Sequence, residues 1–147
     1  RVPSPPRERR RDLPESAMTA AFEALVNAVA HRDYSIHGAK IRLRMFADRI
    51  ELYSPGAIPN TMTVESLPYR QAARNEAITS LLAKCQVPES DKAITGRSAM
   101  MDKRGEGVQI ILEQSERLSG KRPLYRLVDD SELLLVIPAA ALPEAAE

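Results

Sequence analysis

The chain has 147 residues, a formal net charge of +1 and a hydrophobic fraction of 44%. This length is enough for one domain with a buried core, and a charge so close to zero gives no overall field that would attract nucleic acid or an acidic partner. Aromatic residues make up only 4% of the chain and tryptophan is absent, so the core is expected to be aliphatic.

Cysteine and histidine usage narrows the class of protein further. The single cysteine, Cys85, excludes an internal disulfide framework and favours a reducing compartment. Two histidines and one cysteine lack the spacing of a zinc site. No apolar run approaches the roughly 20 residues of a membrane span. We therefore expect a cytoplasmic protein with no membrane contact and, because the chain begins with Arg1, a piece of a longer protein.

The first segment, residues 1–13, is rich in proline and arginine and predicts a linker or a flexible arm. Its basic run, Arg7–Arg11, has two interpretations, a solvated interdomain linker or a contact with phosphate groups. A helix is then predicted from Ser16 to His31, with Pro14 near its first turn and Ser16 as its cap.

This helix has two contrasting faces. One face is expected to pack on a sheet, and it carries Met18, Phe22, Leu25, Val26 and Val29. A polar ridge on the other side carries side chains four residues apart, namely Glu23, Asn27 and His31. Small residues, Ala20, Ala24 and Ala30, leave this ridge low enough for a ligand to approach. A binding site and a half-buried helix with a small polar side are both consistent with this pattern.

Alternating apolar residues predict two antiparallel hairpins in the rest of the chain. Their strands are Lys40–Phe46 with Arg49–Tyr53, and Leu124–Val128 with Leu133–Ile137. Two further helices are predicted, one over Glu76–Lys84 and one beginning near Gly107. These elements indicate an α+β fold, a two-layer α/β sandwich with a mixed, mainly antiparallel sheet and helices on one face, over residues 14–138. A flexible tail is expected at residues 139–147.

The spacing Glu23-x-x-x-Asn27 resembles the N-box of the Bergerat-fold (GHKL-type) ATP-binding superfamily, which includes gyrase, heat-shock chaperones, mismatch-repair proteins and histidine kinases. A longer ordered set is similar to one bacterial and archaeal branch labelled as transcriptional regulators, and it reads Asn27-Ala28, His31-Arg32-Asp33-Tyr34 and Ser54-Pro55-Gly56. In that branch the ATP-binding domain commonly follows a Schlafen/AlbA-type DNA-binding domain. The resemblance runs from about Pro14 to Leu112.

The resemblance implies a site for ATP and Mg2+ on the predicted helix. Glu23 would polarise the attacking water as the catalytic base, and Asn27 would hold the Mg2+ through its carbonyl oxygen. Both roles suit these side chains, because a carboxylate accepts a proton and a hard cation prefers oxygen ligands. His31 lies one turn further on and would reach phosphate or ribose.

Two glycine-containing segments resemble the nucleotide boxes of the superfamily. Ser54 stands where the first box has an aspartate that bonds adenine, and Gly56 is the glycine that remains. Two interpretations of this segment remain: Ser54 contacts adenine through a water, or the segment is a plain turn at the end of a strand. Gly105 and Gly107 resemble the second box, where backbone N–H groups at a helix start face an anion.

Two segments between these boxes also have candidate roles. Gln86–Lys103 is polar, lacks any period and occupies the place of the mobile ATP lid of the superfamily. Arg74 precedes a predicted helix and is a candidate contact for phosphate or a neighbouring domain. The alternative there is an ordinary helix start capped by Asn75.

We therefore expect an ATP- and Mg2+-binding regulatory domain of a bacterial transcriptional regulator, which hydrolyses ATP slowly if at all. DNA would be bound through another domain of the longer protein, and the resemblance is compatible with a homodimer. One alternative is a degenerate, non-hydrolysing sandwich used for interaction or dimerisation, which the replacement at Ser54 favours. Another is a nucleic-acid-binding fragment that acts through Arg7–Arg11.

Overall fold

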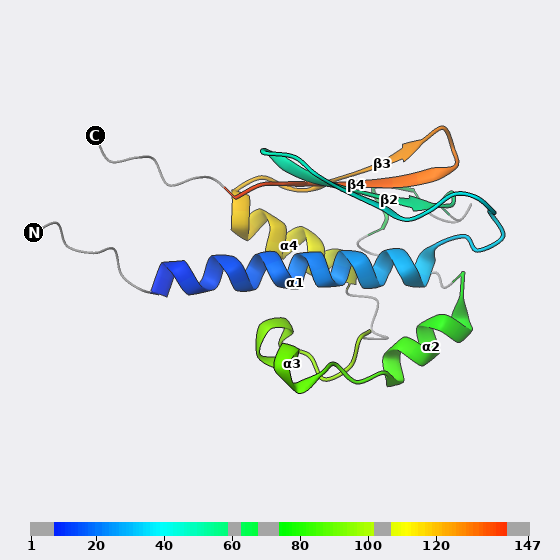
Figure 1. Cartoon of the computed structure of the whole chain (residues 1–147). Helices are drawn as coiled ribbons and strands as arrows, with labels where there is room; N and C mark the ends of the chain where they lie inside the picture. The colour runs from blue at the N-terminus through cyan, green and yellow to red at the C-terminus, as the bar shows by residue number, and fades with distance from the viewer. Residues whose placement is uncertain (1–7, 59–62, 68–73, 102–106, 141–147) are drawn as a thin grey trace, which may run out of the picture.

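A computed structural model of the chain describes residues 8–58, 63–67, 74–101 and 107–140. Its helices lie on one side of a four-stranded sheet (Figure 1). In chain order the elements are α1 (Glu8–His31), β1 (Arg42–Met45), β2 (Arg49–Pro55), α2 (Glu76–Lys84), α3 (Glu89–Thr95), α4 (Gly107–Ser119), β3 (Leu124–Val128) and β4 (Glu132–Pro138).

The sheet has the strand order β1-β2-β4-β3, and each neighbouring pair is antiparallel. Because side chains alternate along a strand, one face of the central strands is apolar and faces the helices. The core on this face includes Leu52 of β2, Leu135 and Ile137 of β4, and Ile111 of α4. The hairpin between β3 and β4 turns at Asp129 and Asp130, whose positive φ angles match the twist of the flanking strands.

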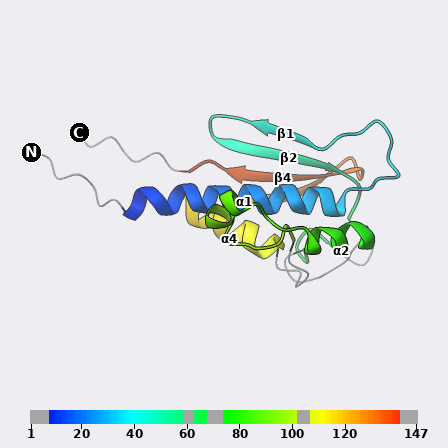
Figure 2. The same cartoon turned by 60° about the horizontal axis from the view of Figure 1, so that its bottom comes forward.

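The predicted two-layer α/β sandwich is confirmed. Figures 1 and 2 show the sheet on one side of α1 and α2 on the other side, with α4 running along α1. The predicted mixed component is not found, since every pairing between the described strands is antiparallel. Among the described residues, no helix is both long enough and apolar enough to cross a membrane.

The start of α1 corrects one sequence prediction. The helix begins at Glu8 rather than Ser16, so Pro14 stands within it and not in its first turn. Glutamate and arginine have high helix propensity, which explains why the basic run continues the helix toward the N-terminus. The predicted linker over residues 1–13 is therefore helical from Glu8 onward, and residues 1–7 lie outside the described part.

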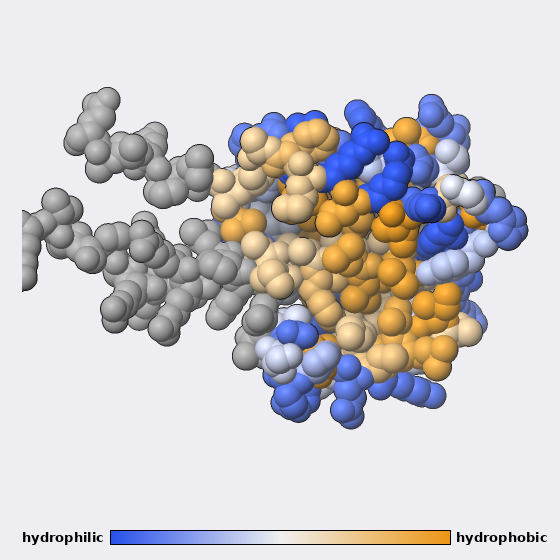
Figure 3. Space-filling view, viewed as in Figure 1, coloured by the Kyte–Doolittle hydropathy of each residue, from blue (hydrophilic) through white to orange (hydrophobic). Residues whose placement is uncertain are grey.

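The orientation of α1 was also predicted wrongly. The large apolar residues of the expected sheet-packing face are half exposed, at 50% for Met18, 41% for Leu25 and 40% for Val29. The buried apolar residues are small, with exposures of 1% for Ala20 and 4% for Ala24. Small side chains let α4 approach α1 closely, and the large residues are left on an apolar surface (Figure 3).

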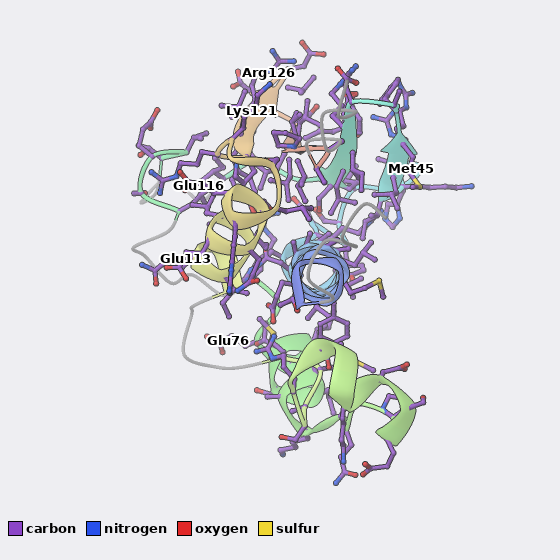
Figure 4. The ribbon with its side chains drawn as sticks, turned by 90° about the vertical axis from the view of Figure 1, so that its left-hand side faces the viewer. Met45, Glu76, Glu113, Glu116, Lys121 and Arg126 are labelled. Atoms are coloured by element: carbon purple, nitrogen blue, oxygen red, sulfur yellow. The ribbon has the colours of Figure 1, made fainter. Side chains whose placement is uncertain are left out.

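The edge strand β1 shows a similar departure. Its alternating apolar residues Leu43 and Met45 are 50% and 76% exposed rather than buried. Their side chains lie on the helix side of the sheet because they pair with Leu52 and Ile50 of β2, but β1 is an edge strand. Figure 4 shows Met45 projecting away from the sheet edge, while Glu113 of α4 points away from α1.

The segment Gln86–Lys103, predicted as a lid without periodic secondary structure, contains a helix in its described part. The helix α3 lies within it and packs against α1. The base of the segment is closed by a bridge between Gln86 and Ala99 and by a hydrogen bond of 2.9 Å from Val87 N–H to the Ser98 carbonyl. Val87 is 2% exposed, so this buried apolar residue fixes the base of a segment whose sequence shows no regular apolar spacing.

Candidate functional site

Glu23, Asn27 and Gly107 meet where α4 begins beside the middle of α1. A Cβ atom placed on Gly107 would lie 3.4 Å from Asn27 Nδ2 and 3.5 Å from Glu23 Oε2. Because Gly107 has no side chain, the backbone at this helix N-terminus lies close to a carboxylate and an amide. The first turn of α4 carries no acidic residue, so its N–H groups and dipole favour an anion there.

Glu23 forms an ion pair with Arg97, which the sequence did not predict. The pair joins Glu23 Oε1 to Arg97 Nη1, and the side chains are only 5% and 15% exposed. Burial strengthens the attraction between opposite charges but also makes each charge costly when its partner is removed. Arg97 lies in an aperiodic polar segment, and no spacing relates it to the residues of α1.

The C-terminal end of α1 is tied down by Arg74 and Asn75. The Asn75 amide donates to the carbonyls of Ala30 and Arg32, at 3.0 and 2.6 Å. Arg74 Nη1 donates to the carbonyl of His31 at 3.4 Å. These carbonyls lack partners within the helix, so the two side chains cap α1. Asn75 is also the N-cap residue of α2, as the alternative predicted, but its side chain makes no capping hydrogen bond there.

His31 sits beside this cap in a partly buried position. Burial lowers its pKa below the ordinary value of 6.5, and the positive charge of Arg74 lowers it further. The ring is therefore neutral at pH 7, and one of its nitrogens is available to accept a hydrogen bond.

Gly56 holds the end of β2 against the same cap. Its φ angle of +126° is one that other residues rarely adopt, and an added Cβ would lie 2.1 Å from Arg74 Nη1. Its N–H donates to the carbonyl of Ser131 at 2.7 Å, and the carbonyl of Pro55 accepts from Asp33 N–H at 2.8 Å. Glycine is required here because Arg74 and Asp33 fill the space.

Ser54 lies between the two ends of the polar ridge. Its hydroxyl donates to the carbonyl of Ala28 at 3.3 Å, which fastens β2 to α1 one residue past Asn27. The hydroxyl hydrogen is used in this bond, while the oxygen lone pairs can still accept from a water.

Arg32 and Asp33, the first residues after α1, form hydrogen bonds within the loop that follows. Arg32 donates to loop carbonyls, those of Asp33, Ile36 and Ala39. Asp33 accepts from the hydroxyl and the N–H of Ser35, and these two hydrogen bonds lower its pKa. The segment is therefore a structural link between α1 and β1.

Apart from Ser54, the predicted site residues within the described part of the chain fall into two groups. One group at the start of α4 is the acidic cluster, Glu23, Asn27, Gly107 and the newly found Arg97. The other group is the clamp at the end of α1, His31, Gly56, Arg74 and Asn75. Gly105 and the side chains of Arg7–Arg11 lie outside the described residues.

The acidic cluster fits Mg2+ only together with further oxygen ligands. Within the described ranges no group of three or more histidine, cysteine, aspartate or glutamate side chains could hold a metal ion. Mg2+ commonly takes one or two protein oxygens and completes its shell with water and phosphate. Asn27 faces Gly107 through its amide nitrogen Nδ2, so its carbonyl oxygen would reach a Mg2+ there only after the amide turns over.

Comparison with known proteins identifies related sequences and folds. A family model described as "Putative ATP-dependent DNA helicase recG C-terminal" matches residues 38–137. This match contains Ser54, Gly56 and Arg74 and begins after α1, which carries Glu23 and Asn27.

A solved structure, the DIP2311 protein from Corynebacterium diphtheriae, has the same fold with a TM-score of 0.66 and 24% identity over 83% of this chain. The chain spans 23% of that protein's length. The comparison with curated proteins finds no match.

Proposed function

The chain belongs to this RecG C-terminal family of ATPase-type domains, and from that premise we propose that it binds ATP with Mg2+ in a Bergerat-type site. The observation that carries the proposal is the convergence of Glu23, Asn27 and Gly107 at the start of α4. A carboxylate, an amide and a helix N-terminus without acidic residues supply the oxygen ligands and N–H donors that a nucleotide phosphate with Mg2+ requires.

Each residue of the site has a role in this proposal. Asn27 holds the Mg2+ through its carbonyl oxygen, and the N–H groups at Gly107, together with Gly105, face the phosphates. The bound Mg2+ would supply positive charge to the phosphate oxygens. Ser54 and Gly56 lie toward the adenine, and His31 accepts a hydrogen bond from ribose or a protonated phosphate, since its ring is neutral.

Arg74 has two competing roles. As a phosphate contact it would have to give up hydrogen bonds to the carbonyls of His31 and Ala57. As a cap it already satisfies the helix end. The contacts of the described structure favour the role as a cap. The role as a phosphate contact stays a prediction, which titration of Arg74→Ala with nucleotide tests.

Glu23 is the proposed base for hydrolysis. A carboxylate beside the phosphate site can take a proton from water, which typically contributes about 10² to 10⁴ in rate. Arg97 occupies one carboxylate oxygen, so hydrolysis is expected to be slow unless this pair opens. Glu23→Gln, which keeps the shape of the side chain, should lower turnover at least about tenfold while nucleotide still binds.

Isothermal titration with Mg·ATP tests the proposal directly. Asn27→Ala should weaken Mg-dependent binding by about tenfold, because it removes a metal ligand present in ground and transition states alike. The matched control is Gln109→Ala, which removes an exposed amide from α4. Absence of heat with the parent protein at millimolar nucleotide would overturn the proposal.

The wider role follows from the resemblance of the ordered motifs. We propose that the domain is a regulatory module of a bacterial transcriptional regulator and that DNA is bound by another, Schlafen/AlbA-type domain of the longer protein. Titrating the longer protein with its target DNA, with and without Mg·ATP, tests this role. A regulatory module requires the affinity for DNA to differ between the two conditions.

A second candidate function is a non-hydrolysing module that dimerises. It is favoured by the exposed apolar stripe of α1, formed by Met18, Leu25 and Val29, because large exposed apolar patches commonly mark interaction surfaces (Figure 3). Light scattering of the parent and of Leu25→Ser tests it. A dimer that the substitution dissociates supports this candidate, and a monomer in both cases removes it.

A further inference from the structure

The buried ion pair of Arg97 with Glu23 connects the segment over residues 86–101 to the acidic cluster. Arg97 follows the helix α3, which packs on α1, and the segment is closed at its base between Val87 and Ser98. The guanidinium is therefore delivered to Glu23 by a short structured unit rather than by a free loop. Opening the pair requires this unit to shift or the Arg97 side chain to change its rotamer.

Arg97 can bind two kinds of anion. The planar guanidinium matches the oxygens of a carboxylate and those of a phosphate equally well. Glu23 Oε2 lies beside Gly107, where the proposed phosphates would sit. A terminal phosphate there would compete with the carboxylate for the same guanidinium.

We propose that Arg97 is a positioning residue that senses the terminal phosphate of a nucleoside triphosphate. Without nucleotide it holds the Glu23 carboxylate, and with a triphosphate it binds the terminal phosphate and releases Glu23. This inference rests on the proposed nucleotide site. A nucleoside diphosphate lacks this terminal phosphate, so Arg97 stays paired with Glu23 in that complex.

The exchange makes triphosphate affinity depend on both members of the pair. Removing the guanidinium in Arg97→Met should abolish any preference for Mg·ATP over Mg·ADP and leave Mg·ADP affinity within about twofold. Removing the competing charge in Glu23→Gln should raise Mg·ATP affinity by about tenfold, because the phosphate no longer competes with a carboxylate. A purely structural ion pair would produce neither result.

The double variant Glu23→Gln/Arg97→Met separates this exchange from simple repulsion between the carboxylate and the phosphates. If the gain in Glu23→Gln comes through Arg97, it disappears in the double variant. If it comes from relief of repulsion, it persists and the inference is wrong. The double variant also leaves no buried charge unpaired within this pair, so it is the form expected to stay folded if Arg97→Met does not.

Hydrogen exchange of the parent protein gives a test that needs no variant. Mg·ATP should change exchange over residues 86–101 and Mg·ADP should not. Equal effects of both nucleotides would overturn the role of Arg97 while leaving the nucleotide site intact. Failure of both to bind the parent would instead overturn the site, and with it this inference.

Discussion

The polar ridge of α1 ends in two regions that use similar residues in opposite ways. In the clamp at the end of the helix, Arg74 and Asn75 donate hydrogen bonds to backbone carbonyls. Neighbouring atoms occupy the place that a side chain at Gly56 would take. The acidic cluster, one to two turns earlier, places Gly107 beside Asn27 and Glu23 and balances a buried carboxylate with Arg97. Saturated hydrogen bonds indicate that Arg74 and Asn75 are structural, whereas a buried charged pair beside a helix N-terminus indicates a binding site.

This comparison predicts that the clamp stabilises the folded protein. Among the proposed substitutions, Gly56→Ala should lower the free energy of unfolding the most. The new Cβ would overlap Arg74 at a φ of +126°, so the free energy of unfolding should fall by about 3 kcal/mol. Urea unfolding measures it. The control is Gly120→Ala, where φ is +71° and no atom lies within 4 Å of the added Cβ, and it should cost about 1 kcal/mol. Equal losses at both positions would contradict the packing argument.

Asn75→Ala should cost about 2 kcal/mol, because two hydrogen bonds to the carbonyls of Ala30 and Arg32 are lost. Nucleotide affinity should stay within about twofold of the parent. Asn27→Ala is the matched amide substitution on the other side of the comparison, and it should weaken binding more than folding. A large loss of affinity in Asn75→Ala without a loss of stability would assign the clamp to the binding site.

Gly107→Ala should affect binding rather than folding. Its Cβ would stand 3.4 Å from Asn27 Nδ2, tolerable for packing but inside the space proposed for phosphate. We expect Mg·ATP affinity to fall by about tenfold, equivalent to about 1.4 kcal/mol, and unfolding free energy to change by less than about 1 kcal/mol. Calorimetric titration together with urea unfolding separates the two. Unchanged affinity would place the phosphates elsewhere.

The smallest effect is expected from His31 on the pH dependence of stability. Its pKa is lowered in the folded state by burial and then by Arg74, so the unfolded chain binds the proton more tightly. Stability contributed by the neutral ring is present above pH 6.5 and is lost as pH falls from there toward the folded pKa. Thermal unfolding over this range should show a slope that His31→Gln reduces. An identical slope in both proteins would contradict the assignment.

The local elements were predictable because each depends on neighbours in the chain. The alternation in Arg49–Tyr53 and the apolar spacing in Glu76–Lys84 identified a strand and a helix close to their observed bounds. Glu23 and Asn27 were found together because residues four apart share one helix face. The placement of Gly107 at a helix start followed from the change of periodicity after it.

The sequence by itself therefore determined the two hairpins, the polar ridge of α1 and the two-layer class, since these depend on periodicities of two and of about 3.6 residues. Only the tertiary structure decided which face of α1 is buried, because the close approach of α4 favours Ala24 over Leu25 on the inner side. It also decided the partners of Glu23 and of the α1 carbonyls. Arg97 and Asn75 reach them from segments far along the chain, and a contact between distant segments leaves no period in the sequence.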